Sequence, residues 1–268
     1  MGLHVHPENT QTCPAVSTPC ISIITAAYNC MHTIGDCLSS LDAQTWEHRE
    51  HLIIDGASQD ATMEVVKAHH HPPKVLLSEP DQGIYDALNK GLTLATGDVV
   101  GFLHADDTYA SPQALALIAE AFQNPAVSAV YGDLLYVDQH DTRRLIRRWH
   151  SKPFAAKDLA WGWMPAHPTL YVRREWYEKI GGFDTSYRIA ADYLSILQLF
   201  IQPDFNPVYV PHVLVHMRLG GASNRSLKAI VRKSAEDWRA LRHCDFNRLG
   251  AARALSWKNL RKIGQFRT

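Results

Sequence analysis

The sequence carries no net charge, no long apolar run and no metal-type cysteine pair, and each absence excludes a class of protein. Its 27 lysines and arginines balance 27 acidic residues. No stretch of about 18 apolar residues occurs, so no membrane-spanning helix is expected. No apolar segment of signal-peptide length follows Met1. The five cysteines lack CxxC spacing, which fits free thiols in a reducing compartment. The sequence therefore predicts a cytoplasmic protein.

Two phosphate-binding fingerprints are also absent. No GxGxxG follows the first expected strand, and GxxxxGK[ST] occurs nowhere. Neither a dinucleotide-binding motif nor a P-loop is therefore present. With 46% hydrophobic and 20% charged residues, the composition is that of an ordinary soluble protein with a sizeable core.

The charge is unevenly distributed along the chain. Residues 225–268 hold twelve lysines and arginines against three acids, whereas residues 1–224 hold 15 against 24. Apolar residues recur at helical spacing among the basic ones, as at Leu227, Ile230 and Val231. A basic amphipathic helix is typical of contact with an anionic membrane surface. The alternative is a helix packed on the domain with a solvated basic face. A nucleic-acid partner is not expected, because no binding motif accompanies the charge.

Short apolar runs alternate with segments of helical periodicity from Cys20 onward. Such alternation indicates βαβ units and a largely parallel sheet. Strands are expected at 21–26, 51–54, 74–78, 98–103 and 127–131. Helices are expected at 33–43, 60–69, 84–95 and 112–122, with Ser111 as the cap of the last. The predicted fold class is α/β, with a mixed, mainly parallel sheet flanked by helices.

The regular alternation ends after residue 133. Segments 134–137 and 143–149 predict a hairpin or flap, and 165–172 predicts a further strand. A short helix at 173–180, a helix at 190–201 and an extended segment at 208–217 follow. We expect three parts: an N-terminal extension (1–19), a main domain (20–222) and a basic amphipathic helical tail (223–268).

The most informative segment is the end of the strand at 98–103, where an apolar run stops at His104-Ala105-Asp106-Asp107. Open α/β sheets bind their ligands at the carboxyl ends of buried strands. Two adjacent carboxylates there repel each other. A divalent cation bridging to a phosphate offsets that charge, because hard oxygen ligands suit Mg²⁺ or Mn²⁺. The alternative is a solvated turn in which Asp107 or Ser111 caps the next helix.

Three earlier strand ends bring polar residues to the same edge. The first ends at Thr25 and Tyr28, in a small-residue turn that a planar group can approach. The second ends at Asp55, which either accepts from a base or ribose or forms an Asx turn. The third leads to Asp81 and to a helix whose free N–H groups suit a phosphate, with Lys90 within reach of a pyrophosphate. Four polar strand ends predict a crevice for a nucleotide and a metal.

Four segments carry a resemblance to a known family. They are ISIITAAYN, HLIIDGASQDAT, SEPDQGIYDALNKGLTLATGDVVGFLHADD and GGFDTSYRIAADYLSIL. Over roughly residues 20–222 the chain resembles the family 2 glycosyltransferases of the Rossmann-like GT-A fold. More narrowly, it resembles bacterial enzymes that extend surface or exopolysaccharides, including colanic-acid-type transferases.

The resemblance implies a nucleotide-diphosphate sugar as donor and Mg²⁺ or Mn²⁺ as cofactor. Asp106 matches the family's metal-binding acid, with Asp107 as a second candidate. His104 stands where the family's first acid stands, and Leu88 stands where several relatives have an arginine that touches the diphosphate. Lys90 is then the candidate substitute for that arginine. The expected donor-binding set is Thr25, Tyr28, Asn29, Asp55, Asp81, Lys90, His104, Ala105 and Asp106.

Asp192 matches the family's catalytic base. At the start of an apolar helix it is expected to be partly desolvated, which raises the pKa toward that of a useful base; the alternative is a simple helix cap. His167 matches a position that faces the acceptor pocket. Trp163 either stacks on a sugar or anchors the core. His216 or Arg218 is expected to touch the diphosphate or the metal from the C-terminal side.

These residues together imply an inverting, metal-dependent glycosyltransferase of surface polysaccharide synthesis. The acceptor is expected to be a saccharide or lipid-linked saccharide, used at the inner face of the cell membrane. Two alternatives stay open. A sugar-nucleotide-forming nucleotidyltransferase would normally show a glycine-rich basic loop after the first strand. A catalytically weak sugar-nucleotide-binding or scaffold protein is suggested by His104 and Leu88.

Overall fold

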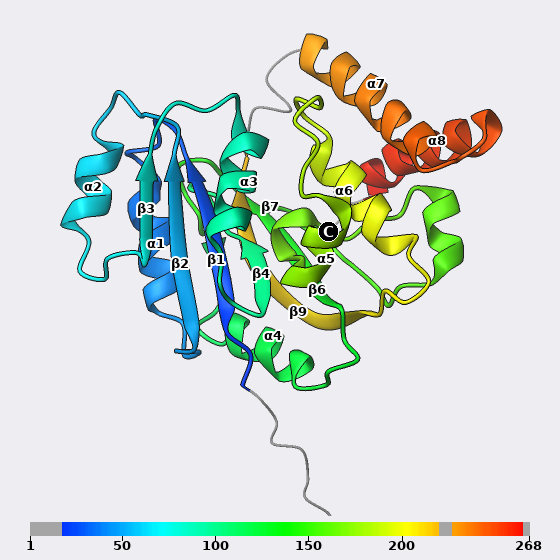
Figure 1. The fold of residues 1–268 in the computed structure, drawn as a ribbon. Coiled ribbons are helices and arrows are strands. Elements are labelled where there is room, and N and C mark those ends of the chain that lie inside the picture. Colours follow the sequence, from blue (N-terminus) through cyan, green and yellow to red (C-terminus); the bar gives the residue numbers. More distant parts are fainter. Residues whose placement is uncertain (1–17, 220–226, 265–268) are drawn as a thin grey trace, which may run out of the picture.

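The computed structural model describes residues 18–219 and 227–264. Within them a 9-stranded sheet runs in the order β3-β2-β1-β4-β8-β6-β9-β5, and β7 pairs with β6 (Figure 1). The strands are β1 (Ile21–Ala27), β2 (Arg49–Asp55), β3 (Val75–Ser78), β4 (Val99–Phe102), β5 (Thr108–Tyr109), β6 (Ala129–Val137), β7 (Leu145–Trp149), β8 (Tyr171–Arg173) and β9 (Pro207–Arg218). The helices are α1 (Ile34–Asp42), α2 (Thr62–Ala68), α3 (Ile84–Leu94), α4 (Ala114–Phe122), α5 (Arg174–Ile180), α6 (Ala191–Phe200), α7 (Leu227–His243) and α8 (Arg248–Gly264), with short 3₁₀ helices η1 (Ala156–Trp161) and η2 (His167–Thr169).

The sheet is mixed but mainly parallel in its first half, as the sequence predicts. Strands β3, β2, β1 and β4 are parallel neighbours, and the antiparallel β8 joins them to the pair β6 and β9. The first four strands therefore all end at one edge, at Ala27, Asp55, Ser78 and Phe102. This edge is where open α/β sheets bind ligands.

Both faces of the sheet are covered, which explains the continuous apolar runs. Successive side chains of a strand point to opposite faces. Ile21 and Ile23 of β1 accordingly pack in the cluster that includes α1 and α4, whereas Ile24 packs with Leu88 of α3 in a second cluster. The expected N-terminal extension falls almost wholly outside the described residues, and the expected boundary at 222/223 falls between the two described ranges.

Two local predictions are wrong. The strand expected at 165–172 begins only at Tyr171, because Pro168 has no N–H for a sheet ladder and residues 167–169 form η2. Ser111 does not cap α4, which begins at Ala114. The side chain of Gln44 replaces it, since its Oε1 accepts the Leu115 N–H at 3.0 Å.

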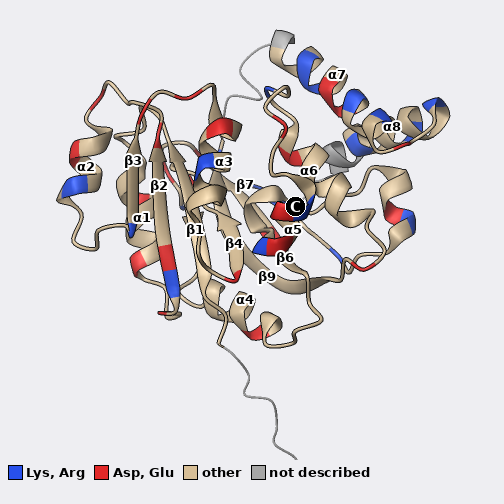
Figure 2. Ribbon diagram, viewed as in Figure 1, with Lys and Arg blue, Asp and Glu red and all other residues tan. Residues whose placement is uncertain are grey.

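The basic C-terminal segment folds into two helices that pack on the domain. α7 contacts α6, and α8 contacts both α7 and η1. Figure 2 shows lysines and arginines along both helices. Their inner faces nevertheless join the main core cluster through Ala240, Leu241, Ala251 and Ala254. None of the described helices combines the length and the apolar character needed to cross a bilayer.

Candidate active site

The loops after β1, β2 and β3 converge on Gly56. A Cβ at this position would lie 2.5 Å from Oδ2 of Asp81 and 3.3 Å from the ring of Tyr28, so any larger residue would displace the Asp81 carboxylate. Tyr28 is 64% exposed, and Asp81 accepts the Gly83 N–H at 2.8 Å through Oδ1. An open aromatic ring and a carboxylate thus lie side by side at the sheet edge.

Asn29 holds this edge together. It adopts φ 48°, a left-handed conformation that asparagine tolerates better than most residues. Its N–H donates to the Ser58 hydroxyl at 2.8 Å, and its Oδ1 accepts the Gln59 N–H at 2.8 Å. The side chain therefore ties the loop after β1 to the loop after β2.

Thr25 and Asp55 lie behind the crevice rather than in it. Both side chains belong to fully buried residues. Thr25 Oγ1 lies 2.9 Å from Nε2 of His51. Asp55 accepts the Ser58 N–H at 3.0 Å and the Ser78 hydroxyl at 2.6 Å, besides the Ser58 hydroxyl. Asp55 thus accepts a backbone N–H three residues on, rather than two residues on as in the Asx turn considered above, and this arrangement positions the exposed groups in front.

Lys90 is likewise engaged within the protein. Its ammonium lies 2.8 Å from Glu79 and donates to the Pro80 carbonyl at 3.1 Å. It therefore braces the loop that carries Asp81. Reaching a diphosphate would require Lys90 to leave both partners.

The end of β4 brings two carboxylates together. Asp106 is partly exposed, whereas Asp107 is 1% exposed and neither of its oxygens makes a hydrogen bond. Burial raises the pKa of Asp107 well above its ordinary value, and the Asp106 charge adds to this, while Arg218 opposes it. A backbone hydrogen bond from Asp107 N–H to the His104 carbonyl (2.9 Å) forms the turn between them, over Ala105.

This carboxylate pair fits a divalent cation. Among the described residues no three metal-ligating side chains converge, so the protein alone would supply only part of a coordination shell. The two unpartnered oxygens of Asp107 and the adjacent Asp106 are hard ligands of the kind that Mg²⁺ and Mn²⁺ prefer, with phosphate oxygens completing the shell.

Strand β9 brings a permanent cation to the same place. The Arg218 side chain is buried, donates to the Gln139 carbonyl at 3.3 Å and pairs with Asp36 of α1. It acts electrostatically on Asp107. His216 lies two residues earlier on β9, opposite Thr108, and burial lowers its pKa.

His167 stacks on Phe102 of β4, with ring centroids 5.3 Å apart, and lies 6.1 Å from the ring of His104. Burial lowers the pKa of His167 to about 4, so the imidazole is neutral at neutral pH. Its Nε2 has no partner and remains available to a ligand. Trp163 is different: it is 7% exposed and packs on Phe154, which is the core-anchor alternative rather than a sugar platform.

Asp192 lies in the first turn of α6. The Tyr85 hydroxyl approaches its Oδ1 at 3.2 Å, and the Tyr193 N–H donates to the same oxygen at 2.8 Å. The expected rise of its pKa is wrong. Burial does raise it, but His167, Lys233, Lys258 and the Tyr193 N–H together outweigh burial, so the pKa falls below its ordinary value of 3.8.

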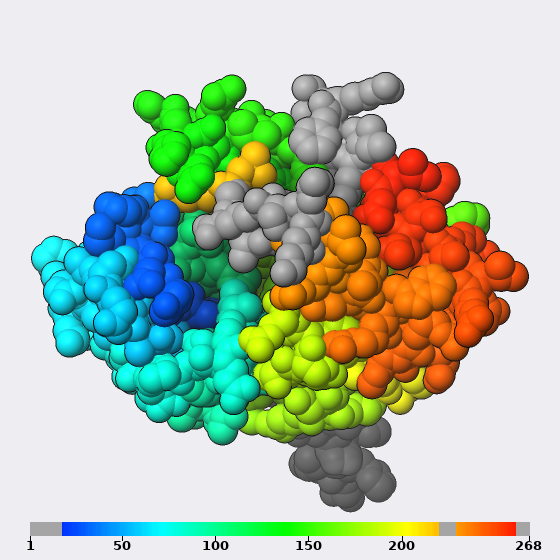
Figure 3. Space-filling model, turned by 90° about the horizontal axis from the view of Figure 1, so that it is seen from above, coloured from blue at the N-terminus to red at the C-terminus, as the bar shows by residue number. Residues whose placement is uncertain are grey.

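The structure adds site residues that the sequence did not single out. Tyr85 contacts Asp192 from α3, and Lys233 and Lys258 act on it from α7 and α8. Tyr85 lies within the quoted motif, but nothing in the sequence relates the two lysines to Asp192. Figure 3 shows the upper face of the molecule. This face includes the segments after β1 and β3, the loop before α6 and helix α7.

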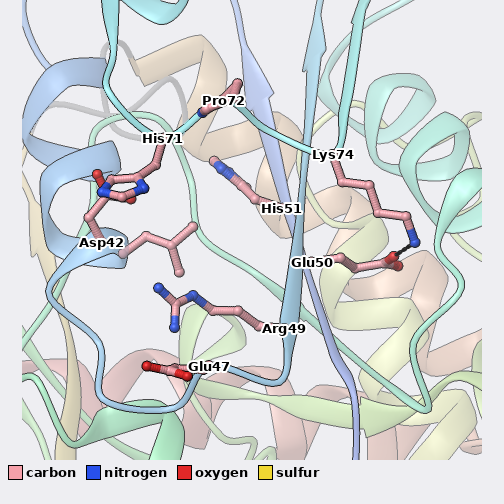
Figure 4. A pocket seen from close by; sticks show the side chains of 9 residues that line it. Asp42, Glu47, Arg49, Glu50, His51, His71, Pro72 and Lys74 are labelled. Carbon is pink, nitrogen blue, oxygen red and sulfur yellow. Dashed lines mark hydrogen bonds and ion pairs between the residues drawn. The ribbon is translucent and has the colours of Figure 1, made fainter.

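A pocket of about 340 Å³ lies elsewhere, beside the amino-terminal end of β2 (Figure 4). It is lined by Leu41, Asp42, Glu47, Arg49, Glu50, His51, His71, Pro72 and Lys74. Two of its carboxylates are paired, Glu50 with Lys74 and Asp42 with His69. It is at the opposite edge from the converging strand ends and does not contain the acids described above.

Comparisons with known protein sequences identify one class of protein, the glycosyltransferases. The profile described as Glycosyl transferase family 2 matches residues 22–190. A PGL/p-HBAD biosynthesis glycosyltransferase of Mycobacterium bovis is 30% identical over 217 residues, covering 78% of this chain and 81% of that protein. An uncharacterised glycosyltransferase of Mycobacterium tuberculosis is 32% identical over 188 residues, covering 68% and 69%.

Solved structures show the same fold at lower identity. Residues 1–349 of S. aureus TarS in complex with UDP-GlcNAc match with a TM-score of 0.66 at 15% identity, covering 91% of this chain and 72% of that one. The mannosyltransferase PcManGT from Pyrobaculum calidifontis, in complex with GDP-Man and Mn²⁺, matches with a TM-score of 0.64 at 20% identity, covering 92% and 71%.

Proposed function

Because this chain belongs to glycosyl transferase family 2 and has the GT-A fold, we propose that it is an inverting enzyme. It moves a sugar from a nucleotide-diphosphate sugar to a hydroxyl group of a saccharide acceptor. The observation that carries the proposal is the position of two acids around one residue: Asp106 and Asp192 both act electrostatically on His104. A leaving-group site and a base thus lie near the same residue.

The donor's base and ribose bind at Tyr28 and Asp81. The exposed Tyr28 ring offers a stacking face, and the Asp81 carboxylate beside it accepts hydrogen bonds. Asn29, Asp55 and Lys90 shape this site through the loop contacts described above. Two neighbours in the fold are complexes with UDP-GlcNAc and GDP-Man, which supports a nucleotide-sugar donor.

Asp106 and Asp107 are the residues that would hold Mg²⁺ or Mn²⁺. The unpartnered Asp107 oxygens support this assignment, and so does the Mn²⁺ in the PcManGT complex. A divalent cation there neutralises the negative charge that develops as the diphosphate leaves. Arg218 supplies further positive charge from β9.

Asp192 removes the proton from the acceptor hydroxyl. The hydroxyl oxygen forms a bond to the anomeric carbon while the bond to the diphosphate breaks, and the electron pair leaves with the nucleoside diphosphate. The single displacement inverts the anomeric carbon and needs no covalent enzyme intermediate. Tyr85 orients the carboxylate, and the neutral His167 offers its free Nε2 to the acceptor.

The test is calorimetric titration with UDP, GDP and dTDP, each with and without Mn²⁺. Metal-dependent binding of one nucleotide supports the proposal and reduces the candidate donors to a few sugars. A folded sample that binds none of the three contradicts it. Mass and NMR analysis of the product formed with that nucleotide's sugars then establishes the anomeric configuration.

A lipid-linked acceptor would place the protein at the inner face of a membrane. The helices α7 and α8 carry exposed apolar side chains, namely Ile230, Val231, Leu249, Trp257 and Leu260, within the basic segment. Such a surface suits anionic lipid. Flotation with vesicles of phosphatidylglycerol is expected to carry the protein, whereas vesicles of phosphatidylcholine alone are not. Equal behaviour with both would contradict the assignment.

The scaffold alternative rests on two departures from the family pattern. His104 replaces the first acid, and Leu88 is fully buried where several relatives present an arginine. Release of free nucleoside diphosphate from the bound sugar nucleotide in the presence of Mn²⁺ separates the two functions, because a scaffold binds the donor without turning it over.

A further inference from the structure

The loop that leads into α6 is held by a carboxylate from outside the loop. Glu236 of α7 accepts three consecutive backbone N–H groups: Arg188 at 3.1 Å through Oε1, and Ile189 at 2.8 Å and Ala190 at 3.0 Å through Oε2. α6 has no side-chain cap of its own, since Ala190 occupies the N-cap position. Glu236 therefore fixes the backbone two residues before Asp192.

The same loop is held on its other side by the donor half of the molecule. The Tyr85 hydroxyl donates to the Ile189 carbonyl at 2.7 Å. The Arg188 guanidinium donates to the Gln82 carbonyl at 2.8 Å, next to Asp81. The segment that carries Asp192 is thus bound between α3 and α7, and neither contact alone defines its position.

α7 is itself fixed in place by buried charge. Lys258 of α8 lies 3.0 Å from Asp237, the residue after Glu236, and both are at most 7% exposed. The Lys258 ammonium also lies 3.2 Å from the ring centroid of Tyr193, the residue after Asp192. One turn further along α7, Arg239 donates to the Ser186 carbonyl at 3.0 Å. A shift of α7 would break the contacts of Asp237 and Arg239, whereas the Lys258–Tyr193 contact ties α8 to α6.

A simple tertiary tether does not need a carboxylate with three N–H groups converging on it. An uncompensated Glu236 carboxylate would repel the negative charge of Asp192. The three N–H groups that donate to Glu236 offset its charge locally. The arrangement therefore gives a rigid backbone attachment at small electrostatic cost to the neighbouring acid.

We propose that Glu236 is a positioning residue for the Asp192 base, and that the α7–α8 hairpin is a part of the active site rather than an appended tail. This inference rests on the proposed function of Asp192. It extends the site to the contacts that Glu236 of α7 makes with the loop before α6.

The test compares three folded variants with the wild type. Glu236→Ala removes all three acceptor contacts. Glu236→Gln, with its carbonyl oxygen at the Oε2 position, keeps the two contacts to Ile189 and Ala190. Ser234→Ala is the matched control on the same helix, because the Ser234 hydroxyl bonds only to Ile230 within α7.

Two readouts separate positioning from stability. The first is nucleoside-diphosphate release from UDP-GlcNAc or GDP-mannose with Mn²⁺ and water as acceptor, together with the dissociation constant of UDP or GDP. Glu236→Ala is expected to lower kcat by roughly 10- to 100-fold with the nucleotide dissociation constant unchanged. Glu236→Gln is expected to restore most of the rate. Ser234→Ala is expected to behave as the wild type.

The second readout is hydrogen–deuterium exchange of the amides of residues 188–190, which needs no substrate. Faster exchange in Glu236→Ala but not in Ser234→Ala is expected. Unchanged exchange, or a wild-type kcat in Glu236→Ala, overturns the positioning role. An Asp192→Asn variant distinguishes a failure of the proposed base from a failure of the positioning role alone. If Asp192→Asn keeps its full kcat, Asp192 is not the base, and the positioning role of Glu236 fails with it.

Discussion

The ammonium of Lys258 on α8 lies 3.0 Å from the carboxylate of Asp237 on α7, and this buried pair borders the candidate base. Burial and the nearby Lys233 lower the pKa of Lys258 to about 7, although Asp237 and Asp192 favour its charged form. Lys258 in turn favours the ionised form of Asp192. The C-terminal helices thus contribute to the electrostatics of the site as well as to its shape.

Replacing Lys258 with methionine should move the acid limb of the pH–rate profile to higher pH. Lys258 is fully protonated well below pH 7, so its positive charge acts in full where Asp192 titrates. Removing that charge raises the Asp192 pKa, because the Lys258 cation favours the ionised carboxylate. The groups that face Asp192 and remain are His104, His167, Tyr85 and Lys233.

The measurement is kcat against pH between 3 and 8, made on Lys258→Met combined with Asp237→Asn, so that no buried carboxylate loses its partner. Lys67→Met, an exposed lysine on α2, is the control. An acid limb that stays in place in the double variant would show that Lys258 does not act on the base.

Replacing Asp192 with asparagine should remove transfer while the donor still binds. Asparagine has the same shape but cannot accept the acceptor's proton. The expected loss of kcat is roughly 100- to 10,000-fold. Nucleotide titration should give an unchanged dissociation constant, because the donor side is built from the loops after β1, β2 and β3. A folded variant that loses donor binding instead would mark Asp192 as a structural residue.

The strand ends at one edge were predictable from local patterns. Apolar runs of strand length gave β1 to β4, and the polar residues after them gave Tyr28, Asp81 and Asp106 at one edge. Local patterns also misassigned some residues. Pro168 interrupts the strand expected at 165–172, because a proline cannot donate to the ladder.

Long-range contacts could not be predicted in the same way. The residues near Asp55 in the sequence do not show that the Ser78 hydroxyl donates to its carboxylate. The residues near Trp163 likewise do not show that its ring is buried against other aromatic rings. The rise expected for the pKa of Asp192 considered only its own helix, whereas the groups that lower it are His167 of η2 and the lysines of α7 and α8. Pairs so far apart in the chain leave no periodic signal.

Removing the divalent cation, or replacing Asp106 with asparagine, should have the same effect. Each removes one side of the contact between a carboxylate and a metal-bound diphosphate, so the strengthening of nucleotide binding by Mn²⁺ should disappear. Calorimetry of the nucleotide with Mn²⁺ and with EDTA checks this. Asp204→Asn, an exposed acid elsewhere, should keep the metal effect. A full metal effect in Asp106→Asn would place the cation on other ligands.

The stability of the fold is expected to fall in acid because Glu50 becomes protonated. Burial raises its pKa, but Lys74, Ser22 and Thr96 outweigh this and lower the pKa to about 2 (Figure 4). A lowered carboxyl pKa stabilises the fold above the unfolded value of 4.5, and this contribution is lost as pH falls toward 2. Glu50→Gln should therefore cost about 3 kcal/mol at pH 7 and little at pH 2. Urea unfolding at both pH values measures this; a cost independent of pH would contradict it.

Two glycines offer a matched test of how α8 is attached. Gly162 and Gly181 both adopt left-handed conformations, with φ 64° and 76°. A Cβ on Gly181 would meet nothing within 4 Å, whereas a Cβ on Gly162 would lie 2.2 Å from the Ala254 carbonyl oxygen of α8. Gly181→Ala should therefore cost only the backbone strain, about 1–2 kcal/mol.

Gly162→Ala carries the same strain and must also displace α8, whose backbone cannot rotate away as a flexible side chain would. The Lys258 Cβ lies 3.1 Å from the same added carbon, so the displacement should move Lys258 off Tyr193 and Asp237. We expect a larger loss of stability than in Gly181→Ala, together with a lower kcat and unchanged nucleotide binding. Thermal unfolding and the nucleotide-release assay give both quantities. Equal stability and equal kcat in the two variants would show that the close approach of α8 to Gly162 contributes nothing to the site.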